Sequence, residues 1–291
     1  MRSRMTLLVA ILLPLVLAAT SPIADASSPE VASAMRASTA EPAVQASRFT
    51  PGPAEPHFLT WNLGGGCCTG VAKGTHLMNA ILSGPQVPIA IAVQEVCEGS
   101  SYGYLKQALA YFGYIENTWW QAEPACGTSG PHFGVAVFWL GSCWGGNNCR
   151  VGGQFSWSNQ APGDANLRGY ACGRGAFPTY FACSAHMTPT SPSKARAQID
   201  EYEVNGALLG FFAKPTMSGD FNRQPGTGFN FQVYNSTWAA ADDCWGGCRP
   251  TKGSITLDYI FSQSCRTDDE VIVSGSVFSD HEMLVGYFSA C

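Results

Sequence analysis

The chain is built from short apolar runs that predict strands, with three stretches of helical spacing between them. Residues 57–63 alternate in polarity and carry aromatic side chains, whereas 87–94 is almost continuously apolar, which is typical of a strand buried on both faces. Further strands are expected at 114–120, 133–139, 176–185, 216–219, 255–261, 270–273 and 284–288, and helices at 75–82, 102–112 and 194–212. Segment 141–175, rich in Gly, Asn and Cys, is predicted to be loop. Strands that outnumber the interleaved helices predict a layered α/β (α+β) fold with a β-sandwich at its centre.

The N-terminal residues predict export. Two arginines precede an apolar run at 5–19 and small residues then fit a cleavage site, so residues 1–26 are predicted to be a signal peptide. This run is shorter than the roughly 20 residues that a membrane span needs, although a retained N-terminal anchor is the alternative. Residues 27–56, rich in Ala, Ser, Pro and Glu, are predicted to be a disordered linker. We therefore expect a secreted protein with no transmembrane segment in its mature form and one folded domain at 57–291.

Twelve cysteines in an exported chain predict disulfide bonds. Cys143 with Cys149 and Cys244 with Cys248 are spaced to close short local loops, but spacing alone does not fix the connectivity. The paired Cys-x-x-Cys motif of a structural zinc site does not occur in the sequence. The formal net charge of −5 excludes attraction of nucleic acid by bulk charge. A phosphate substrate therefore needs a local basic patch, a bound cation, or both.

Polar side chains interrupt or end several of the expected strands. Asp220 and Asn222 follow the strand at 216–219 and lie two residues apart, so in extended chain they share one face. A lone charge inside an apolar strand is costly unless it is paired or binds a metal ion. The residues with this placement are Asn62, Glu95, His186, Asp220, Asn222, Asp258, Asp280 and His281. Each alone fits a local role, such as a turn or a core histidine, but together they favour one shared site.

Such a set of side chains fits metal-assisted cleavage of a phosphoester. Carboxylate and carboxamide oxygens bind hard divalent cations. A neutral imidazole accepts a proton from water, and a carboxylate behind the imidazole fixes its tautomer. A second donor stabilises charge on the phosphorus oxygens or on the leaving oxygen.

Six short motifs occur in a fixed order along the chain. They are Thr-Trp-Asn-Leu at 60–63, Val-Gln-Glu at 93–95, Ser-Ala-His at 184–186, Ser-Gly-Asp-Phe-Asn at 218–222, Leu-Asp-Tyr at 257–259 and Ser-Asp-His at 279–281. In this order they resemble the endonuclease/exonuclease/phosphatase superfamily, over about 58–288. Gly-Asp-Phe-Asn-Arg at 219–223 and Thr-Leu-Asp-Tyr at 256–259 make cytolethal distending toxin B subunits the nearest resemblance. The resemblance implies a DNase I-like four-layer αββα sandwich with its site at one rim of the two sheets.

The resemblance also implies a metal site. Glu95 is expected to be the main ligand of a catalytic Mg²⁺, with Ca²⁺ or Mn²⁺ as alternatives. Asn62 is expected nearby, and Asp280 is expected at the same metal site.

Catalytic roles follow from the same resemblance. Asp220 and Asn222 are expected to position the attacking water and the scissile phosphate. His281, oriented by Asp258, is expected to be the general base or to contact the phosphate. His186 is expected to face the phosphate or the leaving oxygen from the other sheet. Which imidazole or carboxylate takes the water's proton is left open.

The sequence departs from the family pattern in two places. An acidic partner for His186 is not obvious, and Glu123 is a candidate only from its position before the strand at 133–139. The toxin family carries basic residues just after that strand, whereas this chain has Leu-Gly-Ser at 140–142. The remaining candidates for phosphate contacts are Arg168, Arg174 and Arg223.

The resulting expectation is a secreted, metal-dependent DNA-nicking endonuclease of the toxin type, with toxin partner subunits as further partners. The first alternative keeps the site but takes a phosphoinositide or sphingolipid headgroup, with Trp144 or Trp245 meeting a membrane. The second alternative is a non-enzymatic toxin or binding module on the same scaffold.

Overall fold

The computed structural model describes residues 57–64, 70–84, 87–124, 132–140, 154–161, 168–174, 180–209, 214–224, 238–240, 250–263, 266–273 and 278–289. Several predictions fall outside these residues, namely the signal peptide at 1–26, the linker at 27–56, the two short cysteine loops, Trp144 and Trp245. Among the described helices, none combines the length and the apolar character that crossing a membrane requires.

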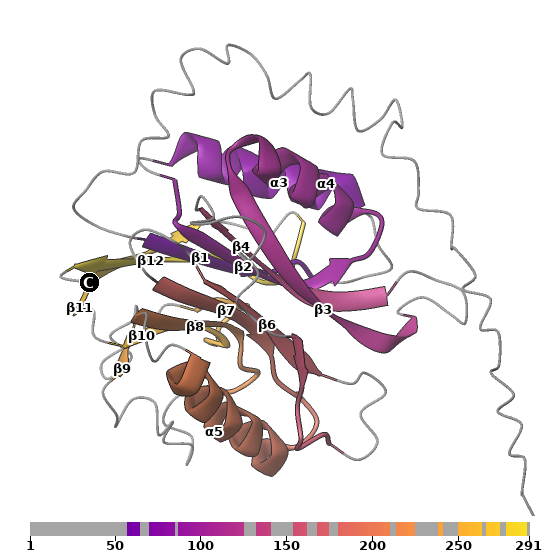
Figure 1. The fold of residues 1–291 in the computed structure, drawn as a ribbon, viewed down its shortest axis with the longest axis vertical. Helices are drawn as coiled ribbons and strands as arrows, with labels where there is room; N and C mark the ends of the chain where they lie inside the picture. The colour runs from indigo at the N-terminus through magenta and orange to yellow at the C-terminus, as the bar shows by residue number, and fades with distance from the viewer. Residues whose placement is uncertain are drawn as a thin grey trace, which may run out of the picture.

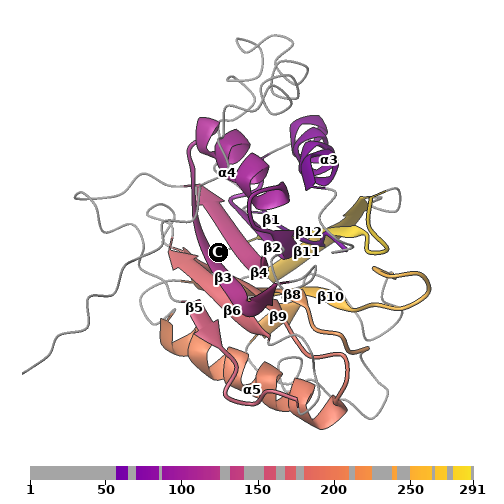
Figure 2. The same cartoon turned by 90° about the vertical axis from the view of Figure 1, so that its right-hand side faces the viewer.

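Two six-stranded mixed sheets stack face to face at the centre of the molecule (Figures 1 and 2). The first sheet has the order β11 (Arg266–Val273), β12 (Met283–Ser289), β1 (His57–Asn62), β2 (Ala90–Cys97), β4 (His132–Leu140) and β3 (Tyr114–Pro124). The second has the order β5 (Gln154–Ser156), β6 (Gly169–Arg174), β7 (Tyr180–His186), β8 (Lys214–Asp220), β10 (Asp258–Gln263) and β9 (Trp238–Ala240).

Each sheet contains one parallel pair of neighbouring strands joined through a helix. Helix α3 (Gly70–Ser83) lies between β1 and β2 in the chain, and α5 (Pro192–Leu209) lies between β7 and β8. Such crossovers are needed because parallel neighbours cannot be joined by a hairpin. Helices α3 and α4 (Ser101–Tyr111) cover the outer face of the first sheet, and α5 covers that of the second (Figure 1). The layers are therefore helix, sheet, sheet and helix, which confirms the predicted αββα sandwich.

Three buried clusters fill the three interfaces between these layers, because successive side chains of a strand point to opposite faces. Representative members are Leu59, Val93, Leu77 and Leu105 under α3 and α4, Phe58, Val137, Ala182 and Ile260 between the sheets, and Met217, Phe261, Ile199 and Tyr202 against α5. Neighbours Phe58 and Leu59 thus belong to different clusters. Both faces of the central strands are buried, which explains their nearly continuous apolar runs.

The prediction that 141–175 is loop is wrong at 154–156 and 169–174, whereas 157–161 and Arg168 lie outside strands and helices as expected. Strands β5 and β6 lie within this segment, and β9 was also not expected. The glycine content of β6 has a packing cause, because a Cβ atom added at Gly173 would lie 2.1 Å from the ring of Trp139 in the facing sheet. Glycine in a strand often marks such a close approach rather than a loop. Helix α3 also begins at Gly70, five residues before the expected start.

A disulfide bond joins two neighbouring strands of the second sheet, β6 and β7. Cys172 and Cys183 are directly opposite on β6 and β7, and both are buried. Cys97 is also disulfide-bonded. The expected disulfide chemistry is confirmed, although the Cys172–Cys183 pairing was not predicted from the sequence.

Candidate active site

The two sheets place polar side chains at equivalent positions of their central strands. In each sheet the parallel pair is flanked by an antiparallel strand, which is β12 beside β1 in the first sheet and β10 beside β8 in the second. The equivalent positions are Asn62 at the end of β1 and Asp220 at the end of β8, Glu95 in β2 and His186 at the end of β7, and His281 before β12 and Asp258 at the start of β10. We call this set the six-residue rim.

The side chains of the rim meet across the gap between the sheets. Asn62 Nδ2 donates to Asp220 Oδ2 at 2.9 Å and to Glu95 Oε1 at 3.3 Å. His186 Nε2 lies 3.5 Å from Asp220 Oδ2 and 3.8 Å from Glu95 Oε1. One amide from the first sheet therefore holds a carboxylate from each sheet close to one imidazole.

Glu95 reaches the rim because of a bulge in β2. The pairing with β4 slips between Gln94 and Val96, and Glu95 has a positive φ of 54°. The extra residue lets Val93 and Val96 both pack under the helices. Gln94 points between the sheets, where its Nε2 donates to Ser184 Oγ of the second sheet at 3.0 Å. The Glu95 side chain, 28% exposed, is thereby left at the open end of the sandwich. A positive φ in a residue other than glycine is strained and often occurs at functional sites.

Asp220 is fixed by a tight turn that follows β8. Asn222, at φ 51°, donates from its backbone N to Asp220 Oδ1 at 2.7 Å, and its Nδ2 donates to Met187 O at 2.9 Å. Asparagine tolerates this left-handed conformation better than most residues. Gly219 is required before it, since a Cβ atom there would lie 2.0 Å from Ala185 O of β7.

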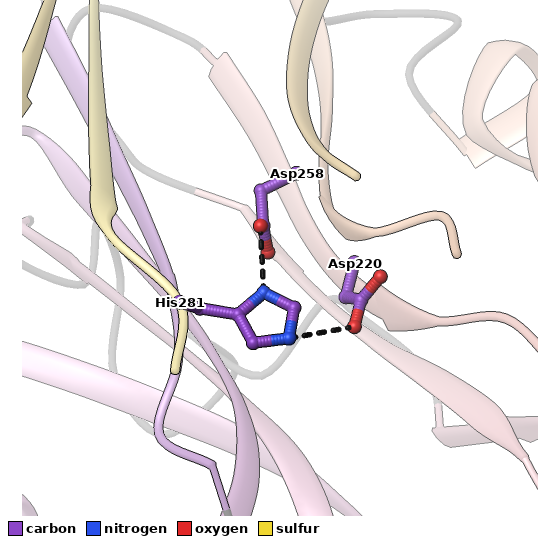
Figure 3. Close-up of side chains that lie close together, drawn as sticks. All are labelled: Asp220, Asp258 and His281. Carbon is purple, nitrogen blue, oxygen red and sulfur yellow. Dashed lines mark hydrogen bonds and ion pairs between the residues drawn. The ribbon is translucent and has the colours of Figure 1, made fainter. Parts of the chain in front are cut away.

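His281 and Asp258 form a buried pair (Figure 3). His281 Nδ1 lies 2.8 Å from Asp258 Oδ2, and His281 Nε2 on the other side of the ring lies 3.6 Å from Asp220 Oδ2. Trp61 Nε1 donates to His281 O at 3.0 Å, and Thr251 Oγ1 accepts from Asp258 N at 3.0 Å. The carboxylate of Asp258 therefore fixes the ring so that Nε2 points at Asp220.

The second imidazole, His186, has an arginine rather than a carboxylate at hydrogen-bonding distance. Arg168 Nη1 lies 2.7 Å from His186 Nδ1 and 2.9 Å from its Nε2. Trp157 Nε1 donates to His186 O at 3.1 Å and holds the end of β7 in place. Arg168 therefore occupies the neighbourhood in which an acidic partner of His186 was sought. Glu123 lies in β3, and its side chain is outside what the structure describes.

The two imidazoles have oppositely shifted affinities for protons. Burial lowers the pKa of His281, but the hydrogen bond that its ring donates to Asp258 and the charges of Asp258 and Asp220 outweigh burial and raise this pKa to about 9. Burial, together with the charge of Arg168, lowers the pKa of His186 well below its ordinary value. Burial and the nearby Asp258 raise the pKa of Asp220 to about 7. At neutral pH the site thus pairs a cationic imidazole with a neutral one.

Two groups of side chains in this site could hold a cation. Oxygen and nitrogen atoms of Asp220, Asp258 and His281 all lie within 4.8 Å of one another. However, His281 Nδ1 and Asp258 Oδ2 already form a hydrogen bond, which a cation between them would replace. Glu95 and Asp220 offer carboxylate oxygens, which hard divalent cations prefer, on either side of the Asn62 amide nitrogen, while Asn62 Oδ1 accepts from Gly64 N at 2.9 Å. The second group is the better match.

The structure brings the predicted residues of the six-residue rim and Asn222 together, while their catalytic roles stay predictions. Asp280 also lies beside the rim, but its exposed carboxylate binds Lys252 Nζ at 2.8 Å. Arg223 Nη1 donates to Asn222 O at 2.6 Å. Arg174 pairs with Phe181 at the opposite end of β6 from Arg168. The two arginines are six positions apart, which corresponds to about 20 Å of extended backbone, and a phosphate contact of Arg174 stays a prediction.

Two lysines near the rim were missed by sequence reasoning. Lys73 of α3 is buried and donates from Nζ to Leu63 O at 2.6 Å and to Gly64 O, just after Asn62. Lys252 Nζ lies 3.1 Å from His281 Nε2. Neither lysine ends an expected strand, so the pattern that revealed the acids and imidazoles carried no signal for them.

Two stacked mixed sheets with helices on both outer faces, open at one rim, define an αββα sandwich of the DNase I-like class. Among solved structures, the chain is similar to an endonuclease/exonuclease/phosphatase from Bacteroides vulgatus, with a TM-score of 0.61 and 12% identity, over 81% of this chain and 99% of that one. It is also similar to the human Nocturnin catalytic domain with bound sulfate, with a TM-score of 0.58 and 18% identity, over 82% and 94%.

A third similar structure is D. rerio TDP2 complexed with a single-strand DNA product, with a TM-score of 0.54 and 12% identity, over 81% of this chain and 99% of that one. These likenesses show that the chain has the endonuclease/exonuclease/phosphatase fold, as its motifs predicted. No protein-family model and no curated protein matches the sequence. The particular closeness to toxin B subunits stays a prediction.

Proposed function

We propose that the protein is a secreted, divalent-metal-dependent phosphodiesterase that nicks DNA, of the cytolethal distending toxin B type. The observation that carries the proposal is the convergence of the six-residue rim, with acids, an amide and two imidazoles from both sheets around Asp220. The DNA product bound to D. rerio TDP2 supports DNA as the first substrate to test, since that protein shares this fold. Delivery into cells by toxin partner subunits belongs to the same proposal.

Glu95 and Asp220, with Asn62 between them, would hold the divalent cation. Their oxygen-rich chemistry fits Mg²⁺, and Ca²⁺ or Mn²⁺ are the alternatives. A cation held there would offset negative charge on the phosphate and increase the acidity of water. Such a cation also supplies attraction for phosphate that a chain of net charge −5 otherwise lacks.

The chain's own groups divide the proton transfers of hydrolysis. Water oxygen forms a bond to phosphorus as the bond from phosphorus to the 3′ oxygen breaks. His281, cationic and fixed by Asp258, donates from Nε2 to the oxygens that gain negative charge. His186, neutral at physiological pH, accepts the proton of water at Nε2, which faces Asp220 at 3.5 Å.

Nicking of a supercoiled plasmid tests the proposal. We expect relaxed plasmid with Mg²⁺, none with a chelator, and none with His186→Ala. The Lys106→Gln variant serves as a control, because Lys106 binds Glu116 at 2.8 Å on the outer side of the first sheet. This variant should cleave the plasmid at the normal rate.

The low basic content of the chain favours one alternative substrate, a phosphoinositide or sphingomyelin headgroup. If the protein releases phosphate or phosphocholine from vesicles of these lipids and does not nick the plasmid, the lipid headgroup rather than DNA is the substrate. Inactivity toward plasmid and both lipids, in a protein whose folded state is verified by circular dichroism, would overturn the enzymatic proposal.

A further inference from the structure

The ammonium of Lys252 lies at the rim and has no role in the chemistry described above. Its Nζ lies 2.8 Å from Asp280 Oδ2 and 3.1 Å from His281 Nε2. His281 Nε2 is the ring atom that faces Asp220. We propose that Lys252 contacts the substrate and that its ammonium binds a nonbridging oxygen of the scissile phosphate beside His281. Lys252 has this role only if the protein cleaves phosphodiesters as proposed above.

The backbone that carries Lys252 is fastened to both members of the buried His281–Asp258 pair. Thr251 Oγ1 accepts a hydrogen bond from Asp258 N at 3.0 Å. Thr251 O accepts another from the backbone N of Glu282 at 2.7 Å, directly after His281. Because Thr251 is buried and precedes Lys252, the Lys252 side chain leaves the backbone at a fixed point relative to the imidazole.

The turn after Lys252 is itself closed. Lys252 and Ile255 exchange backbone hydrogen bonds of 2.9 and 3.0 Å across the turn. Gly253 takes the positive φ of 57° that this tight turn requires. Lys252 therefore lies at the edge of an ordered hairpin rather than at the tip of an open loop.

The carboxylate that holds Lys252 is easily exchanged for phosphate. The side chain of Asp280 is 62% exposed and that of Lys252 is 37% exposed. Ion pairs in such exposed positions contribute only about 0–1 kcal/mol. A phosphate oxygen beside His281 offers the ammonium an anion with a second cationic donor next to it, so the ammonium gains more by turning to the substrate.

Lys73 shows how a structural lysine near this site looks. Its ammonium is buried and its described contacts are backbone carbonyls of Leu63 and Gly64. Lys252 is instead exposed toward the rim and held by a side chain. The different partners separate a lysine that fixes a loop from one that is positioned for a ligand.

Kinetics of Lys252→Met and Lys252→Arg on a labelled DNA duplex test the contact. We expect kcat/KM to fall about 10–100-fold in Lys252→Met and to be largely retained in Lys252→Arg, since the positive charge is kept. The slope of log(kcat/KM) against log[salt] should become shallower by about 1 in Lys252→Met, because one phosphate contact is lost. An unchanged salt slope would overturn the proposal.

A double-mutant cycle with Asp280→Asn separates substrate contact from a role confined to the ion pair. If Lys252 binds phosphate, adding Lys252→Met to Asp280→Asn still lowers kcat/KM about 10-fold or more. If Lys252 only holds Asp280, adding Lys252→Met to Asp280→Asn changes nothing, and the proposed contact is refuted. Lys106→Gln again serves as the charge-matched control on a remote surface.

Binding of inorganic phosphate distinguishes failure of this contact from failure of the proposed function. Titration by calorimetry should show binding to the wild type and about 10-fold weaker binding to Lys252→Met. Equal binding by both proteins overturns the contact while leaving the nuclease proposal intact. Phosphate binding that depends on Lys252 in a protein that cleaves neither DNA nor lipid supports the anion site and refutes the enzymatic function.

Discussion

The two sheets offer equivalent positions to the site but fill them with different chemistry. The first sheet supplies the amide of Asn62, the carboxylate of Glu95 and the imidazole of His281. The second supplies the carboxylate of Asp220, the imidazole of His186 and the carboxylate of Asp258. Each imidazole faces an acid from the opposite sheet. The Asp258–His281 contact is 2.8 Å long, whereas the Glu95–His186 contact is 3.8 Å. Matching topology therefore brings the groups together, and small differences in distance decide what they do.

The close contact with Asp258 favours the charged form of His281, whereas burial and Arg168 favour the neutral form of His186. The pKa of His281 rises to about 9 because Asp258 is hydrogen-bonded to its ring, despite burial. The pKa of His186 falls because of burial and because Arg168 rather than an acid is its nearest charged partner. One residue type can therefore serve as proton donor on one side of Asp220 and proton acceptor on the other.

The largest expected effect comes from removing either imidazole. In the proposed reaction, His281→Gln and His186→Gln should each lower the nicking rate about 10²–10⁴-fold, because each removes one of the two proton transfers. Since both rings act on the same phosphate beside Asp220, the double variant should lose less than the product of the single losses. Single-turnover nicking rates measure this. A single variant within threefold of wild type would refute the division of labour.

The next largest effect concerns the stability of the metal-free protein between pH 7 and 9. The pKa of His281 is about 9 in the folded protein and near 6.5 in the unfolded protein, so protonation of His281 stabilises the fold. This contribution to the free energy of unfolding is fully present below pH 6.5. This contribution is lost as pH rises through 9, by an amount on the order of 3 kcal/mol. Urea denaturation in chelator at several pH values measures it.

The Asp258→Asn variant is the matched test of this pH dependence. It removes the charge that raises the pKa of His281 but keeps the shape of the side chain, so most of the loss between pH 7 and 9 should disappear. An equally steep loss in Asp258→Asn would assign the pH dependence to other groups. His186 contributes little in this window, because its lowered pKa leaves it neutral in the folded protein and it is mostly neutral in the unfolded protein above pH 7.

Much of this site could be predicted because its acids and imidazoles interrupt apolar strands. Asn62, Asp220 and Asp258 stood out as polar residues in strands that are otherwise buried, and burial of such groups requires partners. Lys252 could not stand out in this way, since it lies in a turn where a lysine is ordinary. Arg168 was expected to contact phosphate, but its position against His186 depends on β6. The glycines of this strand had led to the prediction of a loop.

The local conformations at the rim were equally invisible in the sequence. The sequence Val-Gln-Glu-Val at 93–96 does not reveal the bulge at Glu95. The extra residue becomes evident only from the structure, in which Val93 and Val96 pack under the same helices. The pairing of Cys172 with Cys183 depends on the register of β6 and β7, which spacing alone does not specify. Register and bulges are set by contacts between distant segments.

A smaller effect is expected from removing the disulfide bond, which joins β6 to β7, the strand that ends in His186. Replacing both Cys172 and Cys183 by Ala should lower the free energy of unfolding by about 2–3 kcal/mol, because the cross-link no longer constrains the unfolded chain. Arg168 directly precedes β6 and His186 ends β7, so a looser pairing of these strands should also weaken their contact.

Urea denaturation and the histidine NMR resonances measure the two consequences of this double variant. The pKa of His186 should rise towards its ordinary value as Arg168 withdraws, while that of His281 should stay where Asp258 holds it. A shift of both imidazoles together would show that the two sides of the rim are not independent. An unchanged unfolding free energy would contradict the stabilising role of the cross-link.

The smallest effect is expected at the Lys106–Glu116 ion pair, which lies between α4 and β3 and far from the charges of the rim in the chain's fold. Because the Lys106 side chain is 49% exposed, although that of Glu116 is only 13% exposed, Lys106→Gln should cost about 0.2–1 kcal/mol of stability. If the opposite charges of the two imidazoles arise from their immediate partners, removing this remote positive charge should shift neither pKa. NMR titration of Lys106→Gln measures this, and a common shift of both rings would instead assign the asymmetry to the protein's overall field rather than to Asp258 and Arg168.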